Sequence, residues 1–269
     1  LAKSVARLEA SLGLRLFHRT TRQVRLTSDG DRLFERCQRV LSELDELQSE
    51  AAGTRAQVNG TLRIAMPIVY GRKAVLPVLA RLVQQHPQLS LDVRLSDAFV
   101  DLVRDSVDVA IRAGTLDDSS LAATRIASQQ LVLVASPHYL KQHGTPAGVK
   151  DLAKHQHVVF RLPSSGRDRP QQFRVKGRAV ALQPVRGVRF DDGEAMVRAA
   201  ALGLGLAQVP DYMAEDELAD GRLVEVLARL RPPVMPIHAV MPGNRLVPAR
   251  VRALLDALQL NRPGPEGKR

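Results

Sequence analysis

The sequence has little cysteine and few aromatic residues. Its 269 residues include one Cys, no Trp, three Tyr and six Phe. A single cysteine, Cys37, excludes an internal disulfide framework and is typical of a reducing compartment. So few rings also argue against a surface that stacks the bases of single-stranded nucleic acid on repeated aromatic side chains.

Long hydrophobic runs are also lacking. The longest, Ala199 to Ala207, has nine residues and includes two glycines, whereas a membrane-spanning helix needs about 20 apolar residues. No charged stretch followed by an apolar core and a small-residue cleavage site opens the sequence, so secretion is not indicated. We therefore expect a cytoplasmic protein that does not cross a membrane.

What the sequence has in excess is positive charge. It holds 39 Lys and Arg against 28 Asp and Glu, a formal net charge of +11. Phosphate backbones and anionic metabolites are both plausible partners for such a chain, and the charge balance does not choose between them. The 45% hydrophobic and 25% charged residues are typical of a globular protein, and the length fits two domains of about 150 residues each.

The first residues show a helical pattern. Its apolar positions are Leu1, Val5, Leu8 and Leu12. Gly13 follows as a natural stop. No capping residue precedes Leu1, so we expect the chain to open within a helix and the true N-terminus to be missing. Residues 18–27 predict a small hairpin, because apolar and polar side chains alternate along its second strand.

The positive charge is densest in this opening segment. Residues 1–25 hold six basic residues and one acidic residue, a net charge of +5, whereas residues 26–57 hold four basic and seven acidic residues. A helix followed by a basic hairpin suits duplex DNA, because the helix can enter a groove while the hairpin arginines contact adjacent phosphates. On charge alone, a solvated basic face is the alternative.

Residues 28–57 predict one long helix. Its apolar positions alternate spacings of four and three: Leu33, Cys37, Val40, Leu44, Leu47 and Ala51. This heptad seam favours pairing with a second copy of the helix, and the alternative is an amphipathic helix packed on its own domain. We favour the intersubunit seam because its regularity exceeds what one packed face requires. Cys37 faces a core in either case, which indicates a structural cysteine.

Beyond Asn59-Gly60, strand and helix patterns alternate. Strands are predicted at 61–66, 89–95, 107–112, 131–135, 156–160, 186–190, 204–209 and 235–241. Helices are predicted at 71–86, 98–105, 137–143, 149–154, 193–202 and 248–259. Val-rich strands alternating with helices favour a mainly parallel, doubly wound sheet, and so many strands favour two α/β lobes with a cleft. Residues 261–269 hold two Pro and two Gly and predict a disordered tail.

The opening motifs resemble the LysR-type transcriptional regulators. They are Val5-Ala6-Arg7-Leu8-Glu9, Leu12-Gly13-Leu14-Arg15-Leu16-Phe17, Arg19-Thr20-Thr21-Arg22, Leu26-Thr27 and Gly30. The resemblance implies an α/β protein in three parts. Residues 1–27 would be the remainder of a winged helix-turn-helix, 28–57 a linker helix for dimerisation, and 58–260 a two-lobed effector-binding domain similar to periplasmic binding proteins.

The resemblance also implies a function: a DNA-binding transcriptional regulator that responds to a small-molecule inducer and forms homodimers or homotetramers. It is not expected to be an enzyme or to need a cofactor or metal. The residues that match the recognition helix and wing, and would contact double-stranded DNA, are Lys3, Ser4, Arg7, Arg19, Thr20, Arg22, Arg25 and Thr27. The family's first helices have no counterpart here, so this chain alone is expected to bind DNA poorly.

Residues that follow predicted strands are expected to line the inducer site, because ligands of open α/β sheets bind beyond the carboxyl ends of strands. They are Pro67, Ile68, Val69, Ser96, Asp97, Arg112, Ser136, Arg161, Asp191 and Asp192. Arg112 or Arg161 could bind a carboxylate through two hydrogen bonds, which favours an organic acid. Arg112 could instead pair with Asp97 or Asp108, and either aspartate of 191–192 could cap the next helix.

Two other classes of protein remain as alternatives. A solute-binding protein of the same two-lobed fold would need an export signal and has no use for a basic helix. An α/β enzyme would need a catalytic constellation, and no Gly-x-Ser-x-Gly, His-Glu-x-x-His or P-loop motif is present. His155 and His157 are spaced for one strand face, but no third zinc ligand follows nearby.

Overall fold

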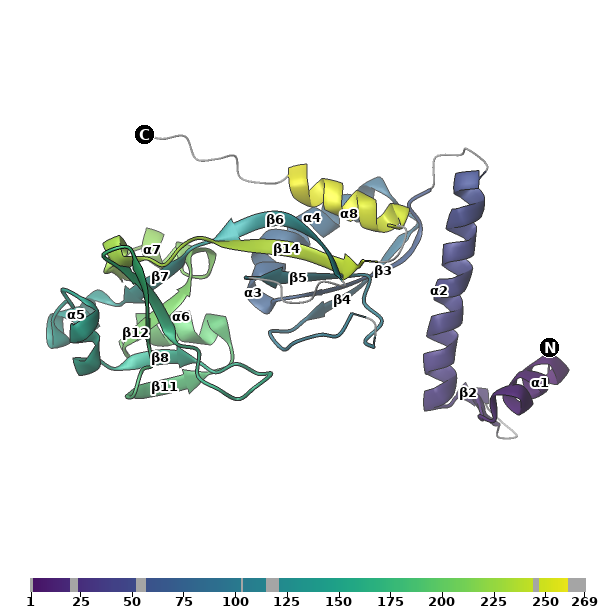
Figure 1. The fold of residues 1–269 in the computed structure, drawn as a ribbon, viewed down its shortest axis with the longest axis horizontal. Helices are drawn as coiled ribbons and strands as arrows, with labels where there is room; N and C mark the ends of the chain where they lie inside the picture. The colour runs from purple at the N-terminus through teal and green to yellow at the C-terminus, as the bar shows by residue number, and fades with distance from the viewer. Residues whose placement is uncertain are drawn as a thin grey trace. The chain divides into compact units, whose positions relative to one another are not determined.

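A computed structural model describes the backbone of residues 2–19, 24–51, 57–102, 104–114, 121–243 and 247–260 (Figure 1). The chain divides into two compact units, Leu1–Gly60 and Thr61–Arg269. The division lies close to the predicted start of the third part at residue 58. The predicted disordered tail, 261–269, lies outside the described residues.

The first unit has the predicted order of helix, hairpin and long helix. Its elements are α1 (Ala2–Leu12), β1 (Phe17–Arg19), β2 (Val24–Leu26) and α2 (Ser28–Ala51). The helix α1 ends at Gly13, whose φ of +65° is a left-handed conformation that glycine adopts without strain. The strands β1 and β2 are antiparallel, with His18 opposite Arg25.

Three hydrogen bonds join the hairpin to the start of α2. The Thr27 hydroxyl donates to the carbonyl of Arg15 (2.6 Å) and accepts from the Gly30 amide (3.0 Å), and the Thr27 amide donates to the Leu16 carbonyl (2.9 Å). Gly30 packs directly on this carbonyl, because a Cβ atom there would lie 2.1 Å from the Leu16 oxygen. Thr27 is therefore the N-cap of α2, and Gly30 permits the close approach.

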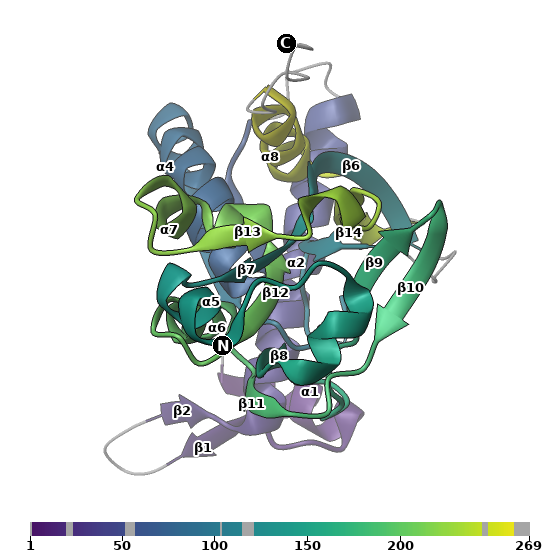
Figure 2. The same ribbon diagram turned by 90° about the vertical axis from the view of Figure 1, so that its left-hand side faces the viewer.

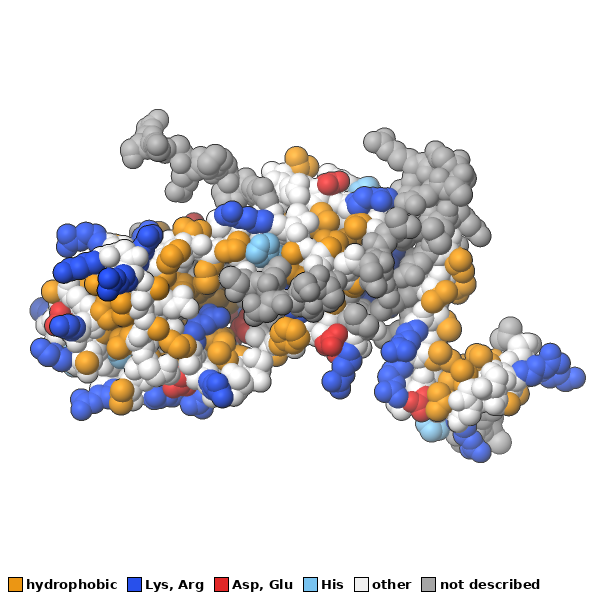
Figure 3. Space-filling view, in the orientation of Figure 1, with side chains coloured by type: hydrophobic (Ala, Val, Ile, Leu, Met, Phe, Trp, Pro, Cys, Tyr) orange, Lys and Arg blue, Asp and Glu red, His pale blue; other side chains and the backbone are white. Residues whose placement is uncertain are grey.

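The predicted seam of α2 is exposed in the single chain. Val40 is 56% exposed and Leu44 48% exposed, and Figure 3 shows hydrophobic side chains along this helix. Cys37 is also exposed in the single chain, so it does not face a core of its own domain, and its place in an intersubunit seam stays a prediction. Leu33 is half-buried, and the side chains of Leu47 and Ala51 lie outside the described residues. Of the described seam residues, only Leu33 is partly covered within the chain.

The second unit consists of two lobes, each built on one five-stranded sheet. Lobe I comprises residues 60–129 and 235–260, with strand order β4-β3-β5-β14-β6. Its strands are β3 (Gly60–Met66), β4 (Leu89–Leu95), β5 (Val109–Ala113), β6 (Leu121–Gln129) and β14 (Met235–Pro242). Its helices are α3 (Ile68–Tyr70), the π-helix η1 (Gly71–Val75), α4 (Leu76–Gln85) and α8 (Ala249–Leu260). The helices α4 and α8 lie in contact (Figure 1).

Lobe II comprises residues 131–230, with strand order β11-β8-β12-β7-β13. Its strands are β7 (Leu131–Ala135), β8 (His157–Phe160), β11 (Gly187–Phe190), β12 (Leu206–Pro210) and β13 (Val224–Val226). A separate hairpin of β9 (Gln171–Val175) and β10 (Arg178–Leu182) lies beside them (Figure 2). Its helices are α5 (Pro137–His143), η2 (Val149–Lys154), α6 (Gly193–Ala201), η3 (Asp211–Met213), α7 (Glu215–Ala219) and η4 (Ala228–Leu230).

The lobe II sheet is buried on both faces. On one face α6 contributes Met196, Val197 and Ala200 to a core with Val134 and Val158 of the sheet. On the other face, α5, η2 and the β9–β10 hairpin form a second core, which includes Tyr139, Leu152, Phe173 and Leu206. This burial explains why the central strands read as continuous apolar runs.

The two lobes are joined by crossing segments. One runs from β6 through Gln130 to β7, and the other runs from η4 back to β14 (Figure 1). The Gln130 side chain links them, since its Nε2 donates to the carbonyl of Pro232 at 2.8 Å. Because β6 and β14 pair along their length, residues far apart in the sequence meet at this crossing.

Both sheets are mixed, so the prediction of a mainly parallel sheet is wrong. β3 pairs with β5, and β8 with β11 and β12, in parallel. β14 is antiparallel to both β5 and β6, and β7 is antiparallel to both β12 and β13. The two antiparallel strands, β7 and β14, are the strands that the chain enters when it crosses from one lobe to the other.

A helix predicted at 98–105 is instead a series of turns among the residues described there. The Asp101 carboxylate accepts from the Arg104 amide at 3.0 Å, and the Asp105 carboxylate accepts from the Asp101 amide at 2.9 Å. Such local side-chain bonds compete with helix formation. Ser106, with φ of +62°, ends the segment. Among the described helices, none is long and apolar enough to cross a membrane.

Candidate functional site

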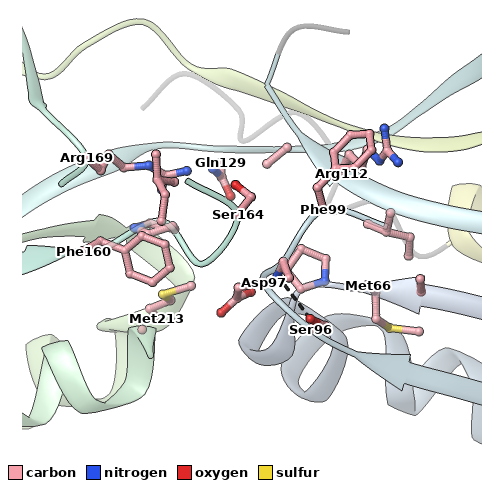
Figure 4. A pocket seen from close by; sticks show the side chains of 18 of the residues that line it. Met66, Ser96, Asp97, Phe99, Arg112, Gln129, Phe160, Ser164, Arg169 and Met213 are labelled. Atoms are coloured by element: carbon pink, nitrogen blue, oxygen red, sulfur yellow. Dashed lines mark hydrogen bonds between the residues drawn. The ribbon is translucent and has the colours of Figure 1, made fainter. Parts of the chain in front are cut away.

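A cavity of about 720 Å³ lies between lobes I and II (Figure 4). Lobe I contributes the carboxyl ends of β3, β4 and β5, and lobe II contributes residues of β8, β12, α6 and η3 together with the loop that follows β8. The walls are amphipathic. Three methionines, Met66, Met196 and Met213, and two phenylalanines, Phe99 and Phe160, line the same space as Asp97 and Arg169. Cavities of this size and character bind metabolite-sized ligands.

Asp97 is the acidic group of the lobe I wall. The Ser96 amide donates to the Met66 carbonyl at 3.0 Å, which brings the ends of β3 and β4 together. The Asp97 Oδ1 accepts from the Ile68 amide at 3.2 Å, and the Ser96 hydroxyl accepts from the Ala98 amide at 3.1 Å. Burial raises the pKa of Asp97, and the Ile68 amide and the positive charge of Arg169 oppose that increase.

Arg169 is the basic group of the lobe II wall. It follows the loop after β8, where its amide donates to the Phe160 carbonyl at 2.8 Å. Its guanidinium lies 5.3 Å from the centre of the Phe160 ring, an arrangement in which the ring face attracts the cation. Loss of hydration lowers the pKa of Arg169, while Tyr212 and Asp97 raise it. A guanidinium is not deprotonated in proteins, so Arg169 brings a positive charge to the cavity wall.

Tyr212 and Tyr70 bring the lobes into contact beside the cavity. Their rings meet edge to face with centres 5.4 Å apart, and Tyr70 belongs to α3 of lobe I whereas Tyr212 belongs to η3 of lobe II. Burial raises the pKa of both hydroxyls, so both rings are neutral at physiological pH. A neutral Tyr212 hydroxyl can donate or accept a hydrogen bond at the cavity wall.

Arg112 lies on the lobe I wall, as predicted, but its guanidinium is engaged locally. It lies 4.3 Å from the centre of the Phe99 ring and donates to the Val100 carbonyl at 2.5 Å. Asp108, one suggested partner, lies 3.8 Å from Arg250 and accepts from the Arg63 amide. The stack with Phe99 and the bond to Val100 hold Arg112 against the turn at 98–105.

Four of the residues predicted from strand ends line the cavity: Pro67, Ser96, Asp97 and Arg112. Three others have local roles. The Ser136 hydroxyl accepts from the Tyr139 amide and caps α5, the Asp192 carboxylate accepts from the Ala195 amide and caps α6, and Arg161 pairs with Asp168 at 3.5 Å. Ile68, Val69 and Asp191 are also not among the lining residues.

Ser136 lies away from the cavity because of strand direction. The rule that ligands bind at carboxyl ends holds for parallel strands. β7 runs antiparallel to β12, so its carboxyl end lies at the opposite edge of the sheet from the ends of β8 and β12. The sequence alone did not reveal this reversal.

Sequence reasoning missed much of the lobe II wall. The missed lining residues of lobe II include Phe160, Ser164, Arg169, Tyr212 and Met213, and Gln129 of lobe I was missed as well. Phe160 ends a predicted strand and could have been found by including the last strand residue in the strand-end rule, whereas Gln129 ends β6, which was not predicted. Arg169 and Tyr212 lie in a loop and a short helical turn, and no local pattern marks them.

Two ion pairs connect the lobes on the α3 side. Arg72 Nη1 lies 2.5 Å from Glu194 Oε2, and Lys73 Nζ lies 2.7 Å from Asp216 Oδ2. Both basic residues belong to the π-helix η1, a rare geometry often found at functional sites. Glu194 follows Gly193, which lines the cavity, so these exposed pairs link the two lobes beside the cavity.

Removing the Lys73–Asp216 pair is expected to loosen the contact between the lobes. A double-mutant cycle with Lys73→Ala and Asp216→Ala should give a coupling energy of about 0.2–1 kcal/mol at low salt, because both groups are partly exposed. The coupling should shrink at high salt, where charges are screened. Urea unfolding of the four proteins measures it, and a coupling of zero at low salt contradicts the role.

The histidines at 155 and 157 lie inside lobe II. His157 is 2% exposed and its Nε2 donates to the Leu152 carbonyl at 2.9 Å. His155 is 5% exposed, with its Nδ1 3.2 Å from the Tyr139 hydroxyl. Among the residues described, no three His, Cys, Asp or Glu side chains are grouped to hold a metal ion.

On the first unit, most of the described residues predicted to contact DNA are accessible. Lys3, Ser4, Arg7 and Arg25 have exposed side chains on α1 and β2. Thr27 is buried and caps α2. Thr20, Arg22 and the side chain of Arg19 lie outside the described residues. Leu8 and Leu12, two apolar positions of the opening helical pattern, are exposed at 43% and 42%.

The fold and the site define a class of protein. A basic helix and hairpin, a long helix with an exposed apolar seam, and a two-lobed domain with an amphipathic cavity together indicate a ligand-responsive DNA-binding regulator. Comparison with protein families agrees. Residues 1–31 match "Bacterial regulatory helix-turn-helix protein, lysR family", and residues 55–261 match "LysR substrate binding domain". The chain belongs to the LysR family of transcriptional regulators.

Individual relatives support this assignment. The chain is 33% identical over 261 residues to the HTH-type transcriptional regulator CrgA of Neisseria meningitidis serogroup C, covering 96% of this chain and 86% of CrgA. A solved structure of CrgA from N. meningitidis has a TM-score of 0.64 at 30% identity, over 96% of this chain and 87% of that one. The full-length structure of AphB, a Vibrio cholerae virulence activator, has a TM-score of 0.65 at 28% identity, over 96% and 87%.

Family membership confirms the predicted fold and the main prediction of function. The protein is a DNA-binding transcriptional regulator with an effector-binding domain, and it is not an enzyme. The match at residues 1–31 favours the regulator over the solute-binding alternative, since the helix-turn-helix has no place in that class. Members of this family bind DNA and small-molecule effectors and form oligomers.

Proposed function

We propose that this regulator acts in the cytoplasm and responds to a metabolite bound in the cavity between lobes I and II. The observation that supports the proposal is the cavity itself, which combines apolar walls with charged groups from both lobes. A ligand that contacts both lobes binds one interlobe arrangement better than others and shifts the population toward it. The ion pairs at η1 are part of the arrangement that would change.

We further propose an organic acid as the effector. The cavity walls carry two arginines, Arg112 and Arg169, against one aspartate, Asp97. Arg112 is held by Phe99 and Val100, and Arg161, the other predicted partner, pairs with Asp168. These engagements support Arg169 as the residue that takes the expected anion-binding role.

A thermal-shift screen of metabolites against the full chain tests the effector site. A ligand present at about 100 times its dissociation constant should stabilise the protein by about 2.7 kcal/mol. The matched control is Ala98→Trp, which fills the cavity from an exposed loop position. Compounds that bind in the cavity should stabilise the native chain and not this variant, whereas equal stabilisation of both would place binding elsewhere.

We propose that the DNA interface consists of α1 and the β1–β2 hairpin. The proposed DNA-contacting residues with exposed side chains are Lys3, Ser4, Arg7 and Arg25. Arg19, Thr20 and Arg22 are proposed on the family match alone. The α2 seam would pair two chains into a homodimer, which burial of Val40 and Leu44 would stabilise, and effector domains would join dimers into a homotetramer.

Replacing Arg25 by alanine is expected to weaken binding to all duplex sequences equally. Because the variant neutralises one phosphate fewer, the slope of log K against log salt should become shallower by about 0.9. Binding of the full-length regulator to a mixed-sequence duplex, measured over a range of salt concentrations, gives this slope. Arg174→Ala, an exposed arginine of the β9–β10 hairpin, should leave the slope unchanged. An unchanged slope in Arg25→Ala excludes a phosphate-binding role for this side chain.

A further inference from the structure

The cavity carries opposite charges on opposite lobes. Figure 4 shows Asp97 on the lobe I side and Arg169 on the lobe II side of the cavity. Each affects the ionisation of the other: the Asp97 charge raises the pKa of Arg169, and the Arg169 charge lowers that of Asp97, although burial is the larger influence on both. The two groups therefore line the same cavity from opposite lobes.

Two other arginines near this wall share one carboxylate. Arg161 and Arg189 both pair with Asp168, at 3.5 and 3.0 Å. In the described part of the chain, no carboxylate lies within ion-pair distance of the Arg169 guanidinium, which is held on the Phe160 ring instead. A guanidinium fixed by stacking keeps its edge free for two parallel hydrogen bonds to one carboxylate.

The opposite end offers an acceptor. One oxygen of Asp97 accepts from the Ile68 amide, so the carboxylate is fixed in position with further acceptor capacity. A partly buried carboxylate gains most from a ligand group that donates a hydrogen bond, because the donor replaces the water that burial has removed. Between the two ends lie apolar side chains, including Phe160, Met196 and Met213.

We propose that the effector is a bipolar acid: a carboxylate that pairs with Arg169, an apolar body of about ring size, and a hydroxyl or ammonium group that donates to Asp97. This inference rests on the proposed function, in which the cavity binds the effector. One guanidinium matches the single charge of a carboxylate better than the double charge of a phosphate monoester. Because the ends lie on different lobes, only a ligand with both groups bridges them, which gives such a ligand its preference for one interlobe arrangement.

A matched series of ring compounds tests the proposal by calorimetric titration of the full chain. The series comprises 4-hydroxybenzoate, 4-hydroxyphenylacetate and 3-(4-hydroxyphenyl)propionate, the same acids without the hydroxyl, and the amides of the hydroxy acids. We expect at least one hydroxy acid to bind. We expect removal of the hydroxyl, or conversion of the acid to its amide, to weaken binding at least tenfold each, as for a charge-assisted hydrogen bond.

Two variants assign these preferences to their residues. In Arg169→Gln the preference for acid over amide should fall to about one while the preference for the hydroxyl remains. In Asp97→Asn the preference for the hydroxyl should decrease, because the acceptor loses its charge, while the preference for acid over amide remains. Arg169→Lys keeps the charge and should retain a reduced preference for acid over amide. If Arg169→Gln does not fold, Arg169→Lys takes its place in the comparison. A tenfold acid preference that persists in Arg169→Gln overturns the proposal.

A further measurement separates this proposal from the proposed function. A small-molecule extract of cells should stabilise the native chain but not Ala98→Trp if the cavity binds any effector. If the extract stabilises the native chain but not Ala98→Trp, and none of the hydroxy acids binds, the cavity is still the effector site. The proposal that the effector is a bipolar acid is then overturned. If neither the extract nor the series distinguishes the native chain from Ala98→Trp, both proposals fail.

Discussion

Replacing Gly205 by alanine is expected to lower the free energy of unfolding by about 3 kcal/mol or more. Gly205 precedes β12 with a φ of +147°, which side-chain-bearing residues rarely adopt. A Cβ atom there would lie 2.4 Å from the Gln156 carbonyl oxygen and 2.6 Å from its carbon. Both are backbone atoms that cannot move without shifting β8, so backbone strain and overpacking act together.

Gly221 provides the matched control. It also has a positive φ, +77°, but a Cβ atom there would meet nothing within 4 Å. Gly221→Ala should therefore show only the backbone component, about 1–2 kcal/mol. Urea unfolding of the full chain gives both values. Equal destabilisation of the two variants would show that the approach of Gly205 to Gln156 does not limit the packing of lobe II.

Much of the fold could be predicted because the central strands carry strong local signals. Strands β4, β7 and β8 are Val- or Leu-rich and were predicted within a residue or two of their bounds. β6 was missed, since its sequence LAATRIASQ is rich in small and polar residues. Its strand structure comes from pairing along its length with β14, which lies more than 100 residues away. Tertiary pairing of this kind overrides weak propensity.

The β9–β10 hairpin carries a local signal that could have predicted it. Lys176 and Gly177, at its turn, both have positive φ, 48° and 80°, which is the requirement of a tight two-residue hairpin turn. Apolar positions alternate on either side, and Phe173 and Val180, which are paired across the strands, pack on the lobe II core. A polar residue followed by glycine, here Lys176-Gly177, between two segments of alternating apolar and polar residues is sufficient to predict such a hairpin.

The site could be predicted for one wall and not for the other. Strand ends in lobe I are consecutive in the sequence and parallel where β3 meets β5, so the strand-end rule located Pro67, Asp97 and Arg112. In lobe II the wall depends on how a loop folds over Phe160 and on where η3 begins after β12. Arg169 looks like any other arginine of a segment with three of them, 161–169, until its neighbours are known.

The two buried histidines predict a loss of stability as the pH falls. Burial lowers the pKa of both His155 and His157, and for His157 the Leu152 carbonyl and the Gln171 side chain oppose the decrease. In the unfolded chain each histidine has a pKa of about 6.5. Below that pH the unfolded state binds protons that the folded state does not bind. The contribution of the two histidines to the free energy of unfolding is therefore complete above about pH 6.5, and it declines as the pH falls toward their lower pKa values in the folded state.

The expected slope is up to about 1.4 kcal/mol per pH unit for each histidine. Urea unfolding of the full chain between about pH 5 and pH 8 measures it, with the midpoint compared at each pH. His157→Asn should remove one of the two contributions, whatever its effect on stability at pH 8, because asparagine does not titrate. His138→Gln, at an exposed position of α5, should leave the slope unchanged. If His157→Asn keeps the full slope of the native chain, another group is responsible for the acid sensitivity, since a buried histidine that titrated as in water would contribute none.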